Sequence, residues 1–125
     1  MKHILSTVLL ISTIFVVLAC RPTAGSAAAQ FQITIPRSNA VVPGEVLTVS
    51  GVGADPAGTI EVEVLTNAWY IQDGEARVNP DGTWTFSPVH LAGKGIYNNH
   101  TIKATIIKAN RRLTSVTVSG IVRRQ

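Results

Sequence analysis

Apolar and polar residues alternate along most of the chain after residue 30. In the segment 60–64, Ile60, Val62 and Val64 alternate with two glutamates. A period of two sends successive side chains to opposite faces of a β-strand, so this segment is predicted to be a strand with one buried face. Similar patterns predict further strands near residues 31–35, 47–51, 69–71, 76–78, 84–86, 102–106 and 116–121.

Turn-forming residues separate these segments. They occur as Pro43-Gly44, Asp55-Pro56-Ala57-Gly58, Asp73-Gly74 and Asn79-Pro80-Asp81-Gly82. The pair Asp73-Gly74 is typical of a tight β-hairpin, and we expect a turn there. No segment after residue 30 sustains helical periodicity. Together these patterns predict an all-β fold, an antiparallel β-sandwich of about seven strands.

Two of the predicted strands carry complementary charges. Glu61 and Glu63 share the outward face of one strand, and Lys103 and Thr105 share that of another. If the two strands are neighbours, a carboxylate and the ammonium group can pair across them. Such exposed pairs contribute less than about 1 kcal/mol each, so we expect them to serve solubility and strand register.

The predicted strands resemble a bacterial immunoglobulin-like domain over nearly all of residues 31–122. The matching segments are Ile33-Thr34-Ile35-Pro36, 44–51, 59–62, Asp81-Gly82-Thr83-Trp84-Thr85 and 100–104. The hairpin that precedes Trp84 is the most specific of them, because many exported bacterial sandwiches place a core tryptophan after that turn. The opening of the domain is also similar to the immunoglobulin-like domain of spore-germination lipoproteins. The resemblance implies a spacer, stalk, adhesion or accessory module without catalytic residues of its own.

The N-terminal residues have the pattern of an export signal. Lys2 precedes an apolar run over 4–19, which only two serines and two threonines interrupt. The run ends in Val17-Leu18-Ala19-Cys20, which resembles a bacterial lipobox, in which a lipid is attached to Cys20 and the leader is removed. This resemblance implies a lipoprotein signal peptide over 1–19, a flexible tether over 20–30, the immunoglobulin-like domain over 31–122 and a basic tail over 123–125.

The lipobox resemblance also implies a location. A palmitoylated lipoprotein is anchored in the cell membrane or outer membrane and faces the periplasm or the exterior, and Arg21 after the cysteine favours the outer membrane. The ten residues 21–30 are small and polar, and such a tether spans about 17 Å on average and roughly 33 Å at full stretch. Two alternatives stay open, namely cleavage after Ala29 in the Ala27-Ala28-Ala29 stretch and an uncleaved signal-anchor helix.

The charge and the cysteine count bound the possible partners. Without residues 1–19, ten basic residues against seven acidic ones leave a net charge of +3. A mildly basic exported domain without a basic and aromatic face gives no reason to expect a nucleic-acid partner. Because Cys20 is the only cysteine, no disulfide can form within the chain, and the fold must rely on core packing and hydrogen bonds.

No catalytic centre, cofactor or metal site is predicted, so the protein is not expected to be an enzyme. The only histidines outside the leader are His90 and His100, which we expect to make hydrogen bonds at the surface or at a strand edge. Two histidines ten residues apart are a weak basis for zinc. Oxygen ligands for calcium occur at Asp73, Glu75, Asn79 and Asp81. These are also the ordinary residues of turns, whose side chains cap the local backbone, and we favour that role.

Two groups of residues are candidate binding surfaces. Trp69, Tyr70 and Tyr97 lie at predicted strand ends or in loops, where exposed rings can stack on sugars, although Trp69 or Tyr70 can instead cap the core. The arginine pairs that bracket the last strand can contact anionic lipid heads or cell-wall polymers, or can be solvated charges; they are Arg111, Arg112, Arg123 and Arg124.

These observations predict a membrane-anchored envelope lipoprotein whose immunoglobulin-like domain acts in binding, adhesion or structural support. The partner is the membrane, through the N-terminal lipid, together with an envelope protein or a polysaccharide. The main alternative is a carbohydrate- or cell-wall-binding module that uses the exposed aromatic residues. A small envelope enzyme or inhibitor is the third hypothesis, and it requires a histidine beside an acid in a pocket.

Overall fold

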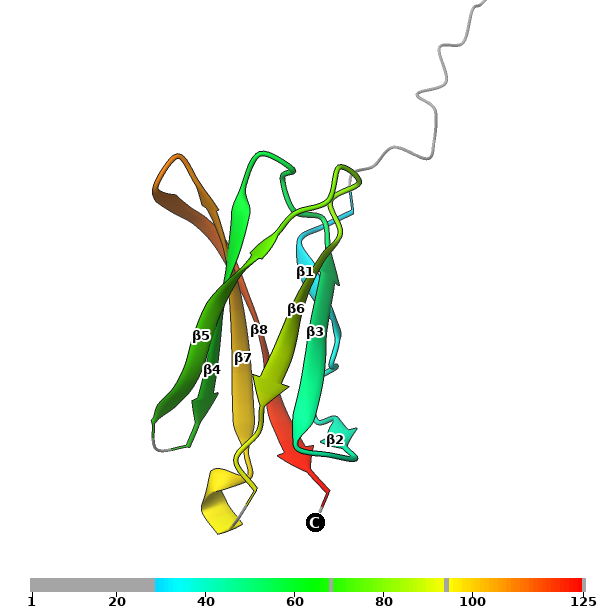
Figure 1. Ribbon diagram of the computed structural model, residues 1–125, viewed down its shortest axis with the longest axis vertical. Coiled ribbons are helices and arrows are strands. Elements are labelled where there is room, and N and C mark those ends of the chain that lie inside the picture. The colour runs from blue at the N-terminus through cyan, green and yellow to red at the C-terminus, as the bar shows by residue number, and fades with distance from the viewer. Residues whose placement is uncertain (1–28, 68, 94, 125) are drawn as a thin grey trace, which may run out of the picture.

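Two β-sheets pack face to face in the computed structural model, which describes residues 29–67, 69–93 and 95–124 (Figure 1). The three-stranded sheet has the order β1 (Gln32–Ile35), β3 (Val46–Val52), β6 (Trp84–His90). The five-stranded sheet has the order β2 (Val41–Val42), β8 (Arg111–Arg123), β7 (His100–Lys108), β4 (Thr59–Thr66), β5 (Tyr70–Arg77). One turn of 3₁₀ helix, η1 (Gly95–Tyr97), precedes β7.

The structure confirms the predicted all-β sandwich, with eight strands rather than about seven. The predicted segments 69–71 and 76–78 belong to one strand, β5, and the additional strand is β2, which has two residues and pairs in parallel with the end of β8. Two residues are too few to show an alternating pattern, which is why the sequence did not predict this strand. The remaining strands pair antiparallel, in the order of an immunoglobulin-like sandwich.

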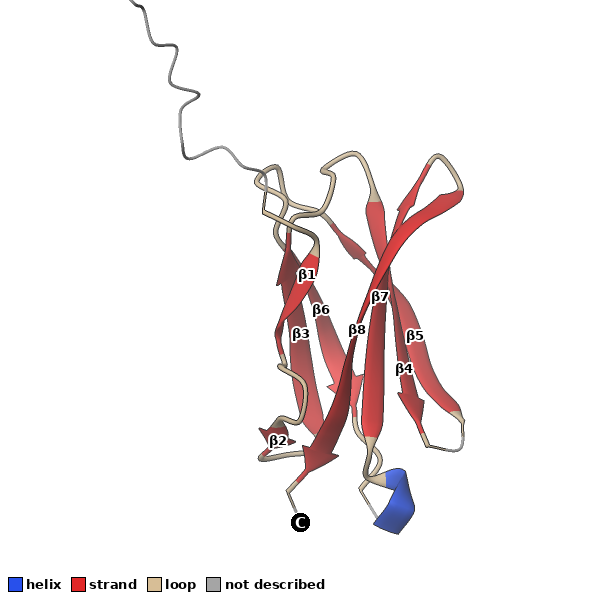
Figure 2. Cartoon of the chain, turned by 180° about the vertical axis from the view of Figure 1, so that it is seen from behind, coloured by secondary structure: helices blue, strands red, loops and turns tan. Residues whose placement is uncertain are grey.

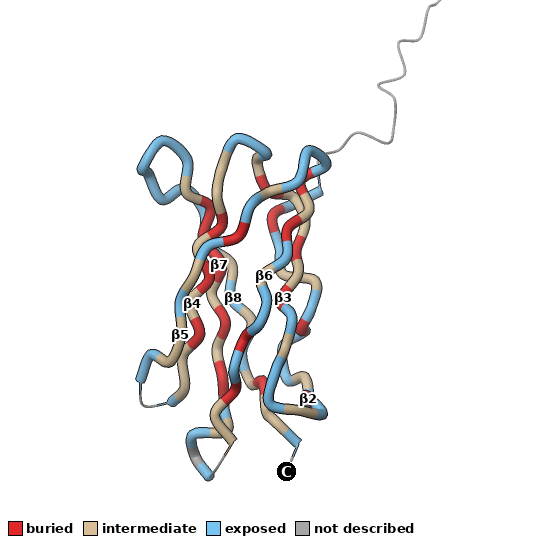
Figure 3. The backbone as a smooth tube through the Cα atoms, in the orientation of Figure 1, coloured by how far each residue is buried: buried red, intermediate tan, exposed pale blue. Residues whose placement is uncertain are grey.

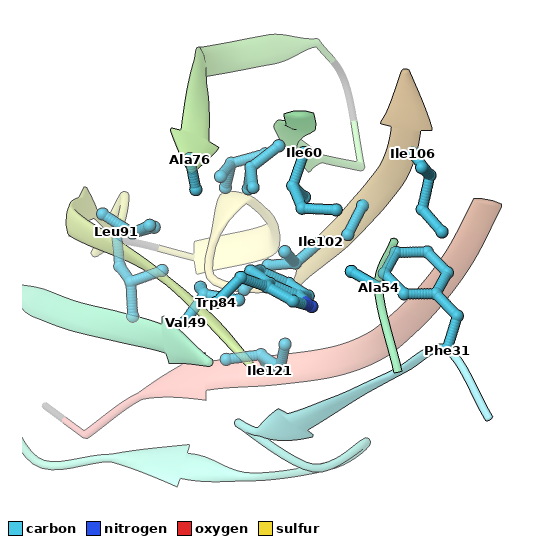
Figure 4. Close-up of a cluster of buried hydrophobic side chains, with 14 of the residues drawn as sticks. Phe31, Val49, Ala54, Ile60, Ala76, Trp84, Leu91, Ile102, Ile106 and Ile121 are labelled. Atoms are coloured by element: carbon cyan, nitrogen blue, oxygen red, sulfur yellow. The ribbon is translucent and has the colours of Figure 1, made fainter. Parts of the chain in front are cut away.

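The alternation in β4 places its apolar residues in the core. Ile60, Val62 and Val64 are fully buried. From the other sheet, the indole of Trp84 lies between the two layers (Figure 4). The centroids of the Trp84 and Phe31 rings are 6.1 Å apart. A Cβ at Gly51 would overlap the Trp84 ring, so the indole fits only because that position of β3 has no side chain.

The hairpin predicted at Asp73-Gly74 is wrong, because both residues lie inside β5. Gly74 pairs with Val62 of β4, and a Cβ at Gly74 would lie 2.5 Å from the ring of Phe86. The glycine therefore makes room for an aromatic side chain of the other sheet instead of forming a turn. The chain reverses earlier, where the backbone N–H of Thr66 donates to the carbonyl of Trp69 at 2.8 Å.

The side chain of Gln72 connects the two sheets on the side where β5 faces β6. The amide nitrogen of Gln72 donates to the carbonyl of Pro88 at 2.8 Å, and its amide oxygen accepts from the backbone N–H of His90 at 2.9 Å. Backbone groups at a strand edge need such partners when no further strand pairs with them. Gln72 thus bonds the edge of β6 from a strand of the opposite sheet.

The two ends of the sandwich carry different loops (Figure 2). At the N-terminal end, Ala29 lies against Gly53, beside the turns that precede β4 and β6, and the turn that precedes β8 lies at the same end, across from them. The C-terminal end carries the loop before β5, the loop with η1 and the last residues of β8. The 13 residues of β8 run from one end to the other, about 40 Å at ~3.3 Å per residue.

Burial follows the same arrangement. Buried positions lie on the strands where the two sheets face each other, and exposed positions gather in the loops at both ends (Figure 3).

Within the described residues, no helix has the length and apolar character needed to cross a bilayer. The predicted signal peptide, Cys20 and nearly all of the tether lie outside the described residues, as does Gln125 of the basic tail.

Candidate ligand-binding groove

An open groove of about 620 Å³ lies at the C-terminal end of the sandwich. Its lining comes from four segments that are far apart in the sequence, namely the residue before β3, the loop before β5, the loop with η1 and the last residues of the chain from the end of β8 to Arg124. The lining residues are Glu45, Trp69, Ala92, Gly93, Tyr97, Arg123 and Arg124. The groove therefore combines exposed aromatic rings with charged side chains on the loops of a rigid scaffold.

Two aromatic rings form one wall of the groove. The ring centroids of Trp69 and Tyr97 are 4.7 Å apart, and the ring planes are tilted by 33°. This centroid distance is typical of favourable aromatic pairs. Trp69 is nevertheless 54% exposed and Tyr97 37% exposed, so much of the surface of both residues stays open to solvent.

The loop before β5 is closed locally around Trp69. The backbone N–H of Trp69 donates to the hydroxyl oxygen of Thr66 at 3.3 Å, and that hydroxyl lies 3.2 Å from the carbonyl of Trp69. Thr66 thereby adds side-chain hydrogen bonds to the backbone bond that closes the turn. This bonding fixes where the indole leaves the end of β4.

Asn98 fixes the other half of the aromatic pair. Its side-chain nitrogen donates to the carbonyl of Arg123 at 2.7 Å, and its side-chain oxygen accepts from the N–H of Arg123 at 2.7 Å. The amide side chain thus bonds the backbone of β8 as a neighbouring strand would. Because Asn98 follows Tyr97 directly, these two bonds hold the Tyr97 loop against the end of the sheet.

Among the described residues that line the groove, the charged ones form one ion pair and leave one further cation. The guanidinium of Arg123 lies 2.6 Å from the carboxylate of Glu45. A Cβ at Gly93 would overlap the Arg123 guanidinium, so the glycine permits this placement. Arg124 is exposed, and its backbone N–H donates to the carbonyl of Val42 at 2.7 Å. Two arginines against one glutamate give the lining a positive charge.

Of the three aromatic residues singled out from the sequence, the structure brings two together. Tyr70 is exposed at the start of β5 but is not part of the groove lining. Its hydroxyl donates a hydrogen bond to Asp73, and this bond raises the pKa of Tyr70 to about 12. Partial desolvation and the charges of Asp73, Glu63 and Glu61 add to the effect.

The structure divides the four candidate arginines between the two ends of the sandwich. Arg111 and Arg112 are the first residues of β8 and lie at the N-terminal end of the sandwich. Arg123 is the last residue of β8, and Arg123 and Arg124 lie at the groove at the other end. They cannot all contact one flat membrane surface at an end of the sandwich. Arg112 also lies 2.7 Å from the carboxylate of Glu61, and is therefore partly neutralised.

The predicted pairing of charges across neighbouring strands is present. In the register of β4 and β7, Glu63 lies opposite Lys103 and Glu61 opposite Thr105. The ammonium nitrogen of Lys103 is 3.8 Å from the carboxylate of Glu63. At this distance and exposure the pair contributes at most about 1 kcal/mol.

The expectation that both histidines lie at the surface or a strand edge is wrong for His100. This residue is fully buried, and its Nδ1 donates to the carbonyl of Ile121 at 2.9 Å. The reason is its position, because β7 lies between β4 and β8, and His100 is in step with the buried Ile102 and Ala104. His90 is exposed at the end of β6.

Of the four residues considered as calcium ligands, Asp81 caps the local backbone, as favoured from the sequence, whereas Asp73 and Glu75 lie within β5 and not in a turn. The carboxylate of Asp81 accepts from the N–H of Thr83 at 3.0 Å and from its hydroxyl at 2.6 Å. These hydrogen bonds, that of the hydroxyl first, hold the pKa of Asp81 below its usual value of 3.8. Asn79 bonds the same hydroxyl at 2.9 Å. Among the described residues, no three His, Asp or Glu side chains gather into a possible metal site.

Sequence reasoning missed the residues that organise the groove. Thr66, Asn98 and Glu45 carry no local motif, and their roles depend on which segments meet at the C-terminal end. The only available signal was the position of Asn98 directly after an exposed tyrosine in a loop rich in glycine and asparagine.

Comparison with known proteins supports the fold alone. No family model matches the chain, and no curated protein matches it either. Among solved structures, it is similar to an engineered protein whose crystal structure was determined at 1.98 Å, with a TM-score of 0.59 and 23% sequence identity. The match covers 79% of this chain and 21% of that protein, so the chain spans about a fifth of its length.

Proposed function

We propose that this protein is a lipid-anchored binding module of the bacterial envelope that holds a saccharide in the groove at its C-terminal end. The observation that carries the proposal is the exposed pair of Trp69 and Tyr97 in a groove whose loops are fixed by hydrogen bonds. The face of an aromatic ring is electron-rich and attracts the C–H bonds on the apolar face of a sugar. A groove of about 620 Å³ is also within the usual range of ligand sites, ~300–1,000 Å³.

The position of the groove agrees with attachment through the N-terminus. Ala29 lies at the N-terminal end of the sandwich, and the groove lies at the other end. With a lipid on Cys20, the N-terminal end would be nearer the bilayer, and the groove would face away from it toward wall polymers. This arrangement favours a binding role over a spacer role, because a spacer has no need of fixed exposed aromatic rings.

The experiment measures binding of the detergent-solubilised full-length lipoprotein to peptidoglycan and to a panel of polysaccharides. The Trp69→Ala, Tyr97→Ala double variant should lose at least about tenfold in affinity, since stacked rings contribute ~1–3 kcal/mol each when replaced by alanine. Tyr70→Ala is the matched control, because it removes an exposed ring outside the groove. Equal affinity of the double variant and the wild type would contradict the proposal.

A further inference from the structure

We infer that the saccharide is acidic and that Arg124 binds its carboxylate or phosphate groups. The inference rests on the proposed function and adds the chemical class of the ligand. Its basis is an imbalance of charge at the groove, where the guanidinium of Arg124, which has no carboxylate partner among the described residues, lines the same cavity as the two aromatic rings.

All seven acidic side chains of the protein belong to its described part, and only one of them lines the groove. That residue is Glu45, and its carboxylate is already paired with Arg123 at 2.6 Å. The others lie on β4 and β5 or in the turns at the N-terminal end; they are Asp55, Glu61, Glu63, Asp73, Glu75 and Asp81. None of the seven forms an ion pair with Arg124.

The backbone that carries the Arg124 side chain is held in place by hydrogen bonds. The N–H of Arg124 is bonded to Val42 of β2, and the preceding residue is held by both Asn98 and Glu45. An arginine on such a base can present its planar fork to a carboxylate or a phosphate with little loss of backbone freedom. A neutral sugar would leave this cation without a counter-charge.

The distribution of acidic residues strengthens the choice of an acidic ligand. Glu61 lies opposite Glu75, and Glu63 opposite Asp73, so four carboxylates occupy neighbouring positions of β4 and β5. Lys103 and Arg112 lie within ion-pair distance of only two of them. This outer face repels a polyanion, whereas the positive groove attracts it, and the field steers an acidic polymer toward the C-terminal end.

The test compares ligands that differ only in charge. Full-length protein in detergent is titrated with an oligogalacturonate and with the methyl ester of the same oligomer, which keeps the sugar rings and removes the carboxylate charge. A polymer of sugars joined by phosphodiesters forms a third arm and separates phosphate from carboxylate as the source of the charge. We expect at least one acidic probe to bind about tenfold more tightly than the ester and to lose affinity as salt rises.

Variants assign the effect to one residue. Arg124→Gln should lower the affinity for the acidic probe about tenfold and leave that for the ester unchanged. Arg111→Gln is the control, because it removes an exposed arginine from the opposite end of β8. Equal binding of acid and ester that depends on Trp69 but not on Arg124 overturns this inference and leaves the proposed function intact. If no saccharide binds in a manner that depends on Trp69, the proposed function and this inference both fail.

Discussion

The side-chain amide of Asn98 forms two hydrogen bonds of 2.7 Å with the backbone of Arg123. A loop residue thereby continues the pairing of β8 beyond the last position at which β7 accompanies it. The same contact fixes the preceding tyrosine, so the shape of the groove depends on a residue that need not touch the ligand.

Asn98→Ala should therefore weaken saccharide binding, although Asn98 does not line the groove. Without these two bonds the Tyr97 loop is free to move in the unbound protein. Because binding must then order the loop, saccharide affinity should fall about fivefold to tenfold. The free energy of unfolding should fall by about 1–2 kcal/mol, measured by urea denaturation. Asn99→Ala removes an exposed neighbouring asparagine and serves as the control. A fall in stability with unchanged affinity would contradict the positioning role.

Gly74→Ala tests the packing of the two sheets. The added methyl group would lie 2.5 Å from the Phe86 ring, and overpacking of this kind costs about 1–3 kcal/mol. Gly44→Ala is the control, because a Cβ there has no neighbour within 4 Å. In the Gly74→Ala, Phe86→Leu double variant much of the loss should be recovered, and strictly additive effects would show that the two residues do not interact.

The bond between Tyr70 and Asp73 can be followed by titration. The hydroxyl donates only while it is neutral, and the Asp73 charge opposes the phenolate, so both effects raise the pKa, to about 12. In a Tyr97→Phe background, Tyr70 is the only tyrosine left. Ultraviolet absorbance of the phenolate should then rise near pH 12, and Asp73→Ala should move the rise down toward the ordinary value of 10. An unchanged titration curve would exclude the bond.

Attachment through Cys20 has a direct chemical test. Mass spectrometry of the mature protein should find a lipid-modified Cys20 at the N-terminus, and washed membranes should release the protein only with detergent. Cys20→Ala should lose this membrane association. A mature N-terminus at Gln30 would instead establish cleavage after Ala29 and a released protein.

The β-strands were predictable wherever a residue's environment follows from its neighbours in the sequence. Ile60, Val62 and Val64 alternate with charges, and all three are fully buried. Gly74 shows where this reasoning fails. A pair typical of a turn lies within a strand because a ring 12 positions later needs the space, and no local pattern records that contact.

The candidate groove was predictable only in part. Trp69 and Tyr97 stand out as large aromatic residues near turn-forming residues, but their stacking depends on the route of the chain between them. Grouping Arg124 with three other arginines as one anionic-surface contact likewise ignored the length of β8, which separates the two pairs by its whole extent. For His100 the signal was present, since its even spacing from Ile102 and Ala104 predicts burial on the same face.

The hydrogen bonds of Gln72 have a consequence for encounters between copies of the domain. Exposed strand edges can recruit a strand from a neighbouring chain. By occupying the carbonyl of Pro88 and the N–H of His90, one glutamine denies both groups to an incoming strand. One glutamine side chain thus reduces the tendency of this strand edge to pair with another copy of the domain.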